Sequence, residues 1–165
     1  MEHNSGNEGA ERFACDPDGL PSLRILVYEA KASAEKGEQR LVFCKTRKET
    51  MDIARQIAKV VGTKPASGAL EALGHLDDSH GKDLLVELFE HCVAYHNSDL
   101  DWDQRDVIER WFRQGDIAVL CATSTLAMGI NLPAKNVFID PNRWDHRTGR
   151  AVGCRRRSSR PNTRI

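Results

Sequence analysis

The stretch IAVLCATSTLAMGINLPA (residues 117–134) is the most informative part of the sequence, because a continuous apolar run gives way to polar residues in a single step. Residues 117–122 are apolar throughout, as is typical of a strand that is buried on both faces of a sheet. Three hydroxyl side chains follow at once: Thr123, Ser124 and Thr125. Gly129 and Asn131 then interrupt regular structure, which fits either a turn into the next strand or a close approach to a ligand.

Helices and strands alternate along the rest of the chain. Strands are predicted at 40–44, 93–96, 117–122 and 136–140, and helices within 19–36, 46–62, 82–92 and 99–114. Residues 63–81 are expected to be loop-like, with at most one helical turn. This alternation predicts the α/β class, with a parallel sheet and right-handed crossovers that place helices on both faces.

Polar residues follow three of the predicted strands, and the carboxyl ends of parallel strands share one edge, where open α/β sheets bind ligands. The groups there are Lys45-Thr46-Arg47-Lys48, Asn97-Ser98-Asp99 and Thr123-Ser124-Thr125. Hydroxyls, backbone N–H groups and helix starts suit phosphate oxygens. Equally, such residues cap helices, and Thr46 with Glu49 has the spacing of a capping box. The residue types alone do not distinguish phosphate binding from helix capping.

The net charge of zero conceals two regions of opposite sign. Residues 143–165 contain eight Arg and one acid, or +7, while the remainder is −7. We expect a disordered segment at 1–18, one domain at 19–142 and a basic tail at 143–165. The tail could contact phosphates, or residues 154–165 could be translated from a shifted reading frame.

Composition narrows the class of protein. No apolar run approaches the roughly 18 residues of a membrane helix, and the polar N-terminus has no apolar signal core, so we expect a cytoplasmic chain with no membrane partner. Five Cys occur without a CxxC pair, and His75/His80 and His91/His96 lack a second ligand pair. We therefore expect reduced thiols and no metal site.

Three segments resemble motifs of the second RecA-like lobe of superfamily 2 helicases, the DEAD/DEAH-box type of motor, in its Ski2-like and Hel308-like branch. LVFCKTRKETMDIA (41–54) is similar to motif IV, and YHNSDLDWDQRDVIERWF (95–112) resembles motif IVa. ATSTLAMGINLPA (122–134) is very close to motif V and is the specific part of the match. The resemblance covers roughly residues 20–150. It implies a P-loop NTPase-type RecA-like fold and an ATP-driven motor on a DNA or RNA strand.

The resemblance, together with the shared sheet edge, selects candidate site residues. Eight are expected to bind the nucleic-acid strand: Thr46, Arg47, His96, Asn97, Arg105, Thr123, Ser124 and Thr125. Thr123 is expected to bond a backbone phosphate. Gly129 and Asn131 are expected nearer the lobe interface, lining the nucleotide cleft. Backbone contacts carry no sequence information, as a translocating motor requires.

The family's ATP chemistry needs parts that this sequence does not contain. It has no GxxxxGK[ST], no DExH or DExD run, and no motif VI after residue 150; such elements cradle phosphates and hold Mg²⁺. We therefore expect no catalytic residue here. ATP and Mg²⁺ are expected only in the complete enzyme, with a first RecA-like lobe in cis or in trans, and the chain is interpreted as a fragment, truncated product or split subunit.

Two other functions stay open at this point. The same fold could be a binding module without motor activity, for nucleic acid or for a partner protein. An unrelated α/β enzyme could use Cys121 as a nucleophile, although the apolar run around Cys121 places it inside the strand, with no His or acid beside it in the sequence.

Overall fold

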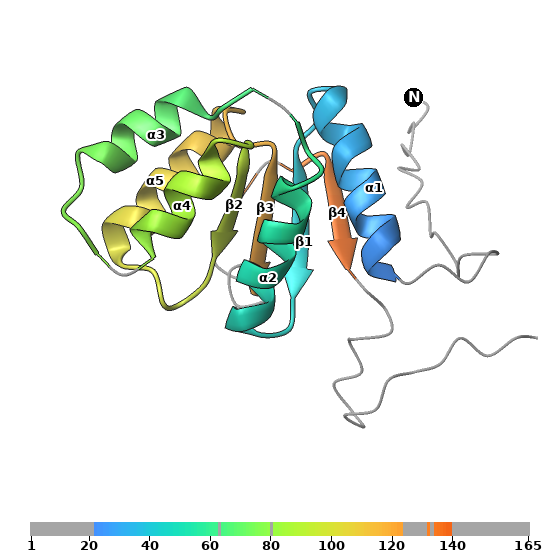
Figure 1. The fold of residues 1–165 in the computed structure, drawn as a ribbon, viewed down its shortest axis with the longest axis horizontal. Helices are drawn as coiled ribbons and strands as arrows, with labels where there is room; N and C mark the ends of the chain where they lie inside the picture. The colour runs from blue at the N-terminus through green and yellow to red at the C-terminus, as the bar shows by residue number, and fades with distance from the viewer. Residues whose placement is uncertain (1–21, 63, 80, 124–131, 133, 140–165) are drawn as a thin grey trace, which may run out of the picture.

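A computed structural model describes residues 22–139 apart from 63, 80, 124–131 and 133. Its centre is a parallel sheet of four strands in the order β2-β3-β1-β4 (Figure 1). The strands are β1 (Arg40–Cys44), β2 (Val93–His96), β3 (Val119–Thr123) and β4 (Asn136–Ile139). The helices are α1 (Ser22–Glu35), α2 (Arg47–Ala58), α3 (Ser67–Gly74), α4 (Lys82–Phe89) and α5 (Trp102–Arg113). The predicted α/β class and parallel sheet are confirmed.

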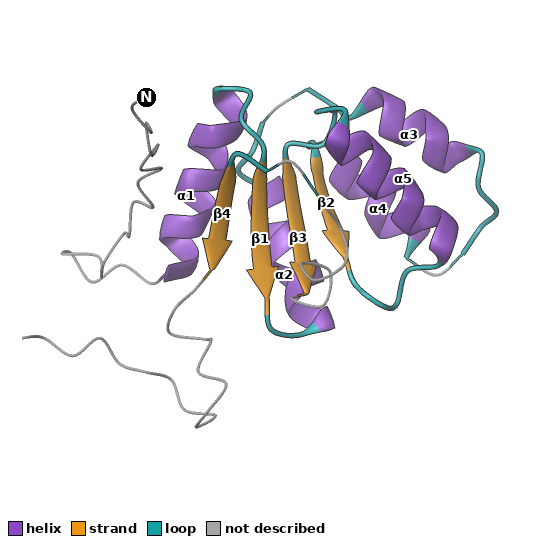
Figure 2. Cartoon of the chain, turned by 180° about the vertical axis from the view of Figure 1, so that it is seen from behind, coloured by secondary structure: helices purple, strands orange, loops and turns teal. Residues whose placement is uncertain are grey.

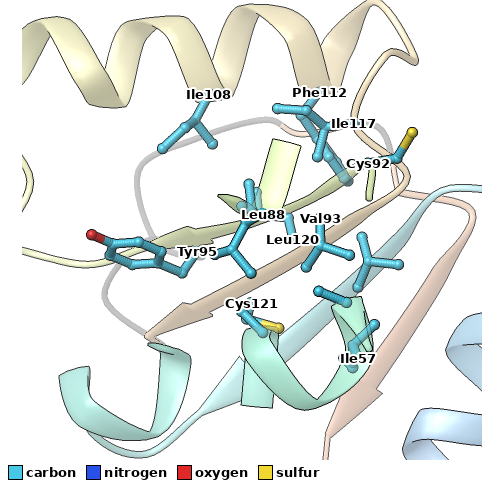
Figure 3. Packing of buried hydrophobic residues seen from close by; sticks show 14 of the residues in the cluster. Ile57, Leu88, Cys92, Val93, Tyr95, Ile108, Phe112, Ile117, Leu120 and Cys121 are labelled. Carbon is cyan, nitrogen blue, oxygen red and sulfur yellow. The ribbon is translucent and has the colours of Figure 1, made fainter. Parts of the chain in front are cut away.

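Helices pack on both faces of the sheet: α2 lies across β1, β2 and β3 on one face, and α5 lies against β2 on the other. Register places Val42 opposite Cys121 and Tyr95 opposite Cys121, and this row of side chains meets α2. Side chains alternate between the faces of a strand, so the neighbouring residues of β2 and β3 point the other way, toward α5. Figure 3 shows Ile57 of α2 on the same side of the sheet as Cys121, and Ile108 and Phe112 of α5 on the other side.

The helix starts follow from local sequence. Thr46 is the N-cap of α2, and its hydroxyl accepts a hydrogen bond from Glu49 N at 3.2 Å. The Glu49 carboxylate accepts a hydrogen bond from Lys45 N at 2.7 Å. In a capping box it would accept from the N-cap itself, Thr46 N, so the predicted box is only half formed. A full capping box opens α5 instead, between Asp101 and Gln104. That helix therefore begins at Trp102, three residues later than the predicted start at 99.

Helix α3 corrects the prediction for residues 63–81, which were expected to form at most one helical turn. It spans eight residues, and its N-cap residue Ala66 makes no side-chain capping bond. The missing cap comes from far along the chain, because the Asp116 carboxylate accepts from Ala69 N at 3.1 Å. A tertiary contact thus stabilises a helix that local signals do not predict.

None of the helices among the described residues has the length and apolar character needed to cross a membrane.

Candidate nucleic-acid interface

The carboxyl ends of β1, β2 and β3 lie along one edge of the sheet, where all strand arrows point in Figure 2. Cys44, the last residue of β1, pairs with Thr123, the last residue of β3, and His96 at the end of β2 pairs with Ala122. The residues that follow these ends are therefore neighbours in space. We call the described part of this edge, residues 45–48, 97–99 and 123, the rim.

The start of α2 gives the rim its positive character. Lys45, Thr46, Arg47 and Lys48 are all exposed. The N-terminus of a helix carries a partial positive charge and unpaired N–H groups, which here adjoin two lysines that make no ion pair with other described residues. Fixed N–H donors beside flexible cations are a combination that suits an anion such as a phosphate.

Arg47 and Asn97, both predicted to bind the strand, also hold the rim together. Arg47 forms an ion pair with Asp99, which links α2 to the loop after β2. Asn97 is buried; its Nδ2 donates to Arg47 O at 3.2 Å and to Thr50 Oγ1 at 2.9 Å. Its Oδ1 accepts from Asp99 N at 2.9 Å. The N–H donors of Asn97 are thus used inside the fold. They hold the start of α2, where the side chains from Lys45 to Lys48 are exposed.

His96 lies beneath the rim and faces α5. It is buried, and its Nε2 lies 3.0 Å from Glu109 Oε1. Burial lowers the pKa of His96 because the imidazolium is poorly solvated there, and the hydrogen bond with Glu109 opposes this only in part. A neutral imidazole bonded to a carboxylate supports the packing of α5 on β2.

Arg105 projects from the first turns of α5. Its Nε donates to Asp101 O at 3.3 Å, which draws the guanidinium toward the start of the helix. The terminal nitrogens of Arg105 have no hydrogen-bond partner among the residues that the structure describes. Arg105 therefore presents free donors at the β2 end of the rim, unlike His96.

Thr123 is half-buried at the end of β3 and forms the middle of the rim, between the ends of β1 and β2. Four other predicted site residues lie outside the described part of the chain: Ser124, Thr125, Gly129 and Asn131. Their expected roles in strand binding and in the nucleotide cleft stay predictions.

Cys121 is buried inside β3, as its apolar run indicates. A hydrogen bond with the Cys44 thiol and burial both raise the pKa of the Cys121 thiol well above its usual value. Since the thiolate is the nucleophile, this environment suits a core side chain rather than a reactive one.

Sequence reasoning did not select several residues that shape the site. Lys45 and Lys48 belong to the predicted polar edge and flank two selected residues, but they were not among the eight residues expected to bind the strand. Thr50 and Glu109 were missed because their partners, Asn97 and His96, come from another element of the fold.

The four-stranded parallel sheet, its helices on both faces and its polar carboxyl edge define a RecA-like α/β domain. Residues 21–157 match the model of the helicase conserved C-terminal domain, and the chain belongs to this family. The matched residues include most of the expected domain and part of the basic segment after residue 142.

Three relatives support this assignment. The chain is 38% identical over 124 residues to the ATP-dependent DNA helicase Hel308 of Thermoplasma acidophilum, covering 74% of this chain and 17% of that protein. It is 36% identical over 143 residues to Hel308 of Methanocella arvoryzae, covering 82% and 19%. It is 36% identical over 124 residues to the ATP-dependent DNA helicase MER3 homolog of Oryza sativa subsp. japonica, covering 71% and 10%. The chain therefore spans less than a fifth of the length of these relatives.

Proposed function

We propose that this chain is the second RecA-like lobe of an ATP-dependent nucleic-acid helicase, in which the rim holds the backbone of one strand. The observation that carries the proposal is the shared edge of β1, β2 and β3, where the exposed cations at the start of α2 follow the end of β1, which pairs with Thr123. The names of the relatives favour DNA as the strand.

The character of the rim fits a contact that must form and release. Neutral hydroxyl and N–H donors bind phosphate less tightly than a bidentate Arg clamp, and Arg47 is already paired with Asp99. Lysines contribute charge without fixed geometry. Such contacts favour binding of the strand backbone without preference for a base sequence.

ATP hydrolysis in this proposal requires a first RecA-like lobe, in the same polypeptide or in another one. The 165 residues contain no GxxxxGK[ST] or DExH run that would cradle the phosphates and hold Mg²⁺. Gly129 and Asn131 would line this lobe's wall of the cleft. The chain by itself is expected to bind a strand weakly and to turn over no ATP.

The test is binding of a fluorescent single-stranded oligonucleotide, followed by anisotropy over a range of salt concentrations. The Lys45→Ala/Lys48→Ala variant removes two cations from the rim. We expect weaker binding and a salt slope smaller by about 1.4, because each phosphate contact on a single strand contributes roughly 0.7.

The matched control is Lys59→Ala/Lys64→Ala, which makes the same charge change away from the rim. Lys59 follows the end of α2, and the backbone carbonyl of Lys64 contacts Cys92, just before β2 begins. Equal losses in the two double variants would show a diffuse charge effect and refute the rim. Binding with no salt dependence would refute the phosphate grip itself.

A further inference from the structure

We propose that Trp102 is a stacking platform for one base of the bound strand, placed at the β2 end of the rim. This inference rests on the proposed function, and it adds a contact to a base where the rim contacts only the backbone.

The position of Trp102 is unusual for so large an apolar side chain. It is 72% exposed, whereas Trp111 on the same helix packs against the core. A single exposed aromatic carries little meaning by itself, so the case depends on where the residue lies and how it is held. It is the first residue of α5, which begins just after the rim segment 97–99.

Hydrogen bonds on both sides hold the backbone that carries Trp102. Asp101 Oδ1 accepts from Gln104 N at 2.8 Å, and Gln104 Oε1 accepts from Asp101 N at 3.2 Å. The Gln104 Nε2 also donates to Ser79 Oγ at 2.8 Å, and Leu100 is buried. The backbone on both sides of Trp102 is therefore fixed before any ligand arrives, which lowers the entropy lost on stacking.

A cation accompanies the ring. Arg105 is three residues after Trp102, so the two share one face of the helix, and the hydrogen bond to Asp101 O brings its guanidinium to the same turn. The Arg47–Asp99 ion pair joins the loop just before this turn to the start of α2. A strand that follows the rim from Lys45 and Lys48 would meet a ring and a cation together.

The charges beside the ring favour a base over a phosphate. Asp101 and Asp103 are exposed next to Trp102, and their carboxylates would repel the backbone. A base presents an uncharged π-face, and stacking between bases and aromatic side chains depends little on sequence. The ring would therefore contact a base while the lysines and Arg105 hold the phosphates.

The experiment measures affinity of the full chain for two labelled single-stranded oligonucleotides: one with bases and one abasic strand of equal length. We expect Trp102→Ala to weaken binding of the first by roughly 10- to 100-fold, the loss of one stack, and to leave the abasic strand unaffected. The salt dependence of binding by Trp102→Ala should have the same slope as that of the wild type, since no phosphate contact is lost. Trp102→Phe should retain much of the affinity.

Tyr28 is the matched control, because it is 71% exposed on α1 and lines a separate hollow between α1 and α2. An equal loss in Tyr28→Ala, or an equal loss on the abasic strand, would overturn the stacking role. Unchanged binding of the strand with bases by Trp102→Ala would also overturn the stacking role. That result is expected if Trp102 serves only to associate with a first-lobe polypeptide. If wild type bound neither strand, the proposed function itself would fail.

Discussion

Gly68 in α3 provides a sharp test of the packing between α3 and α5. A Cβ added at Gly68 would lie 2.3, 2.4 and 2.8 Å from Cζ3, Cη2 and Cε3 of Trp111. Carbon atoms in favourable contact are about 3.5–4.0 Å apart, so Gly68→Ala forces the ring and the helix apart by roughly 1 Å. The Trp111 Nε1 is buried without a hydrogen-bond partner among the described residues, so apolar packing sets the position of this ring.

The magnitude follows from two opposing effects. Overpacking of this kind costs about 1–3 kcal/mol, whereas Ala is favoured over Gly inside a helix by up to about 1 kcal/mol. The gain is smaller here because Gly68 is only the second residue of α3. We expect Gly68→Ala to lower the free energy of unfolding by about 1–2 kcal/mol, or roughly 2–8 °C in Tm for a domain of this size.

Gly74 is the matched control on the same helix, because no atom lies within 4 Å of a Cβ built there. Gly74→Ala should be neutral or stabilising by less than about 1 kcal/mol. Urea unfolding followed by far-ultraviolet circular dichroism measures both variants without relying on Trp111 as the reporter. In the Gly68→Ala background, Trp111→Leu should recover stability through a coupling of about 0.5–3 kcal/mol. If Gly68→Ala is as stable as Gly74→Ala, the close packing of α3 on α5 is refuted.

Two further predictions concern the residues beneath the rim. Asn97→Ala should lower the free energy of unfolding by about 2–4 kcal/mol in the same urea assay. Three buried or half-buried hydrogen bonds are lost at roughly 1 kcal/mol each, and a cavity is left. A loss under about 0.5 kcal/mol would show that the amide does not join the rim segments. The lowered pKa of His96 means that the folded state binds a proton less readily than the unfolded state, so stability should fall as the pH drops from about 6.5 toward the folded pKa. His96→Gln should show a shallower loss between pH 7.5 and 5.5 by urea titration, and equal slopes in the two proteins would contradict the burial effect.

The sequence determined the class of fold and most of its elements, because these depend on signals that are local. The period of apolar residues distinguishes α2 and α5 from the strands, and the cap at Thr46 is predicted from residues three positions apart. The cap at Asp101 was not predicted, and α5 accordingly begins three residues later than expected. Parallel topology then follows from alternation, which places Thr46, Asn97 and Thr123 on one edge. The helicase resemblance depended on a contiguous motif, and the family match supports it.

Which of these polar residues are available to a ligand depends on long-range contacts in the folded chain. Arg47 meets Asp99 across 52 residues and Ala69 is capped by Asp116 across 47, and no local pattern encodes either contact. The physical reason is that a buried donor or acceptor must find a partner wherever the fold places one. Asn97 and His96 became internal supports in this way, while Arg105 and Trp102 remained at the surface.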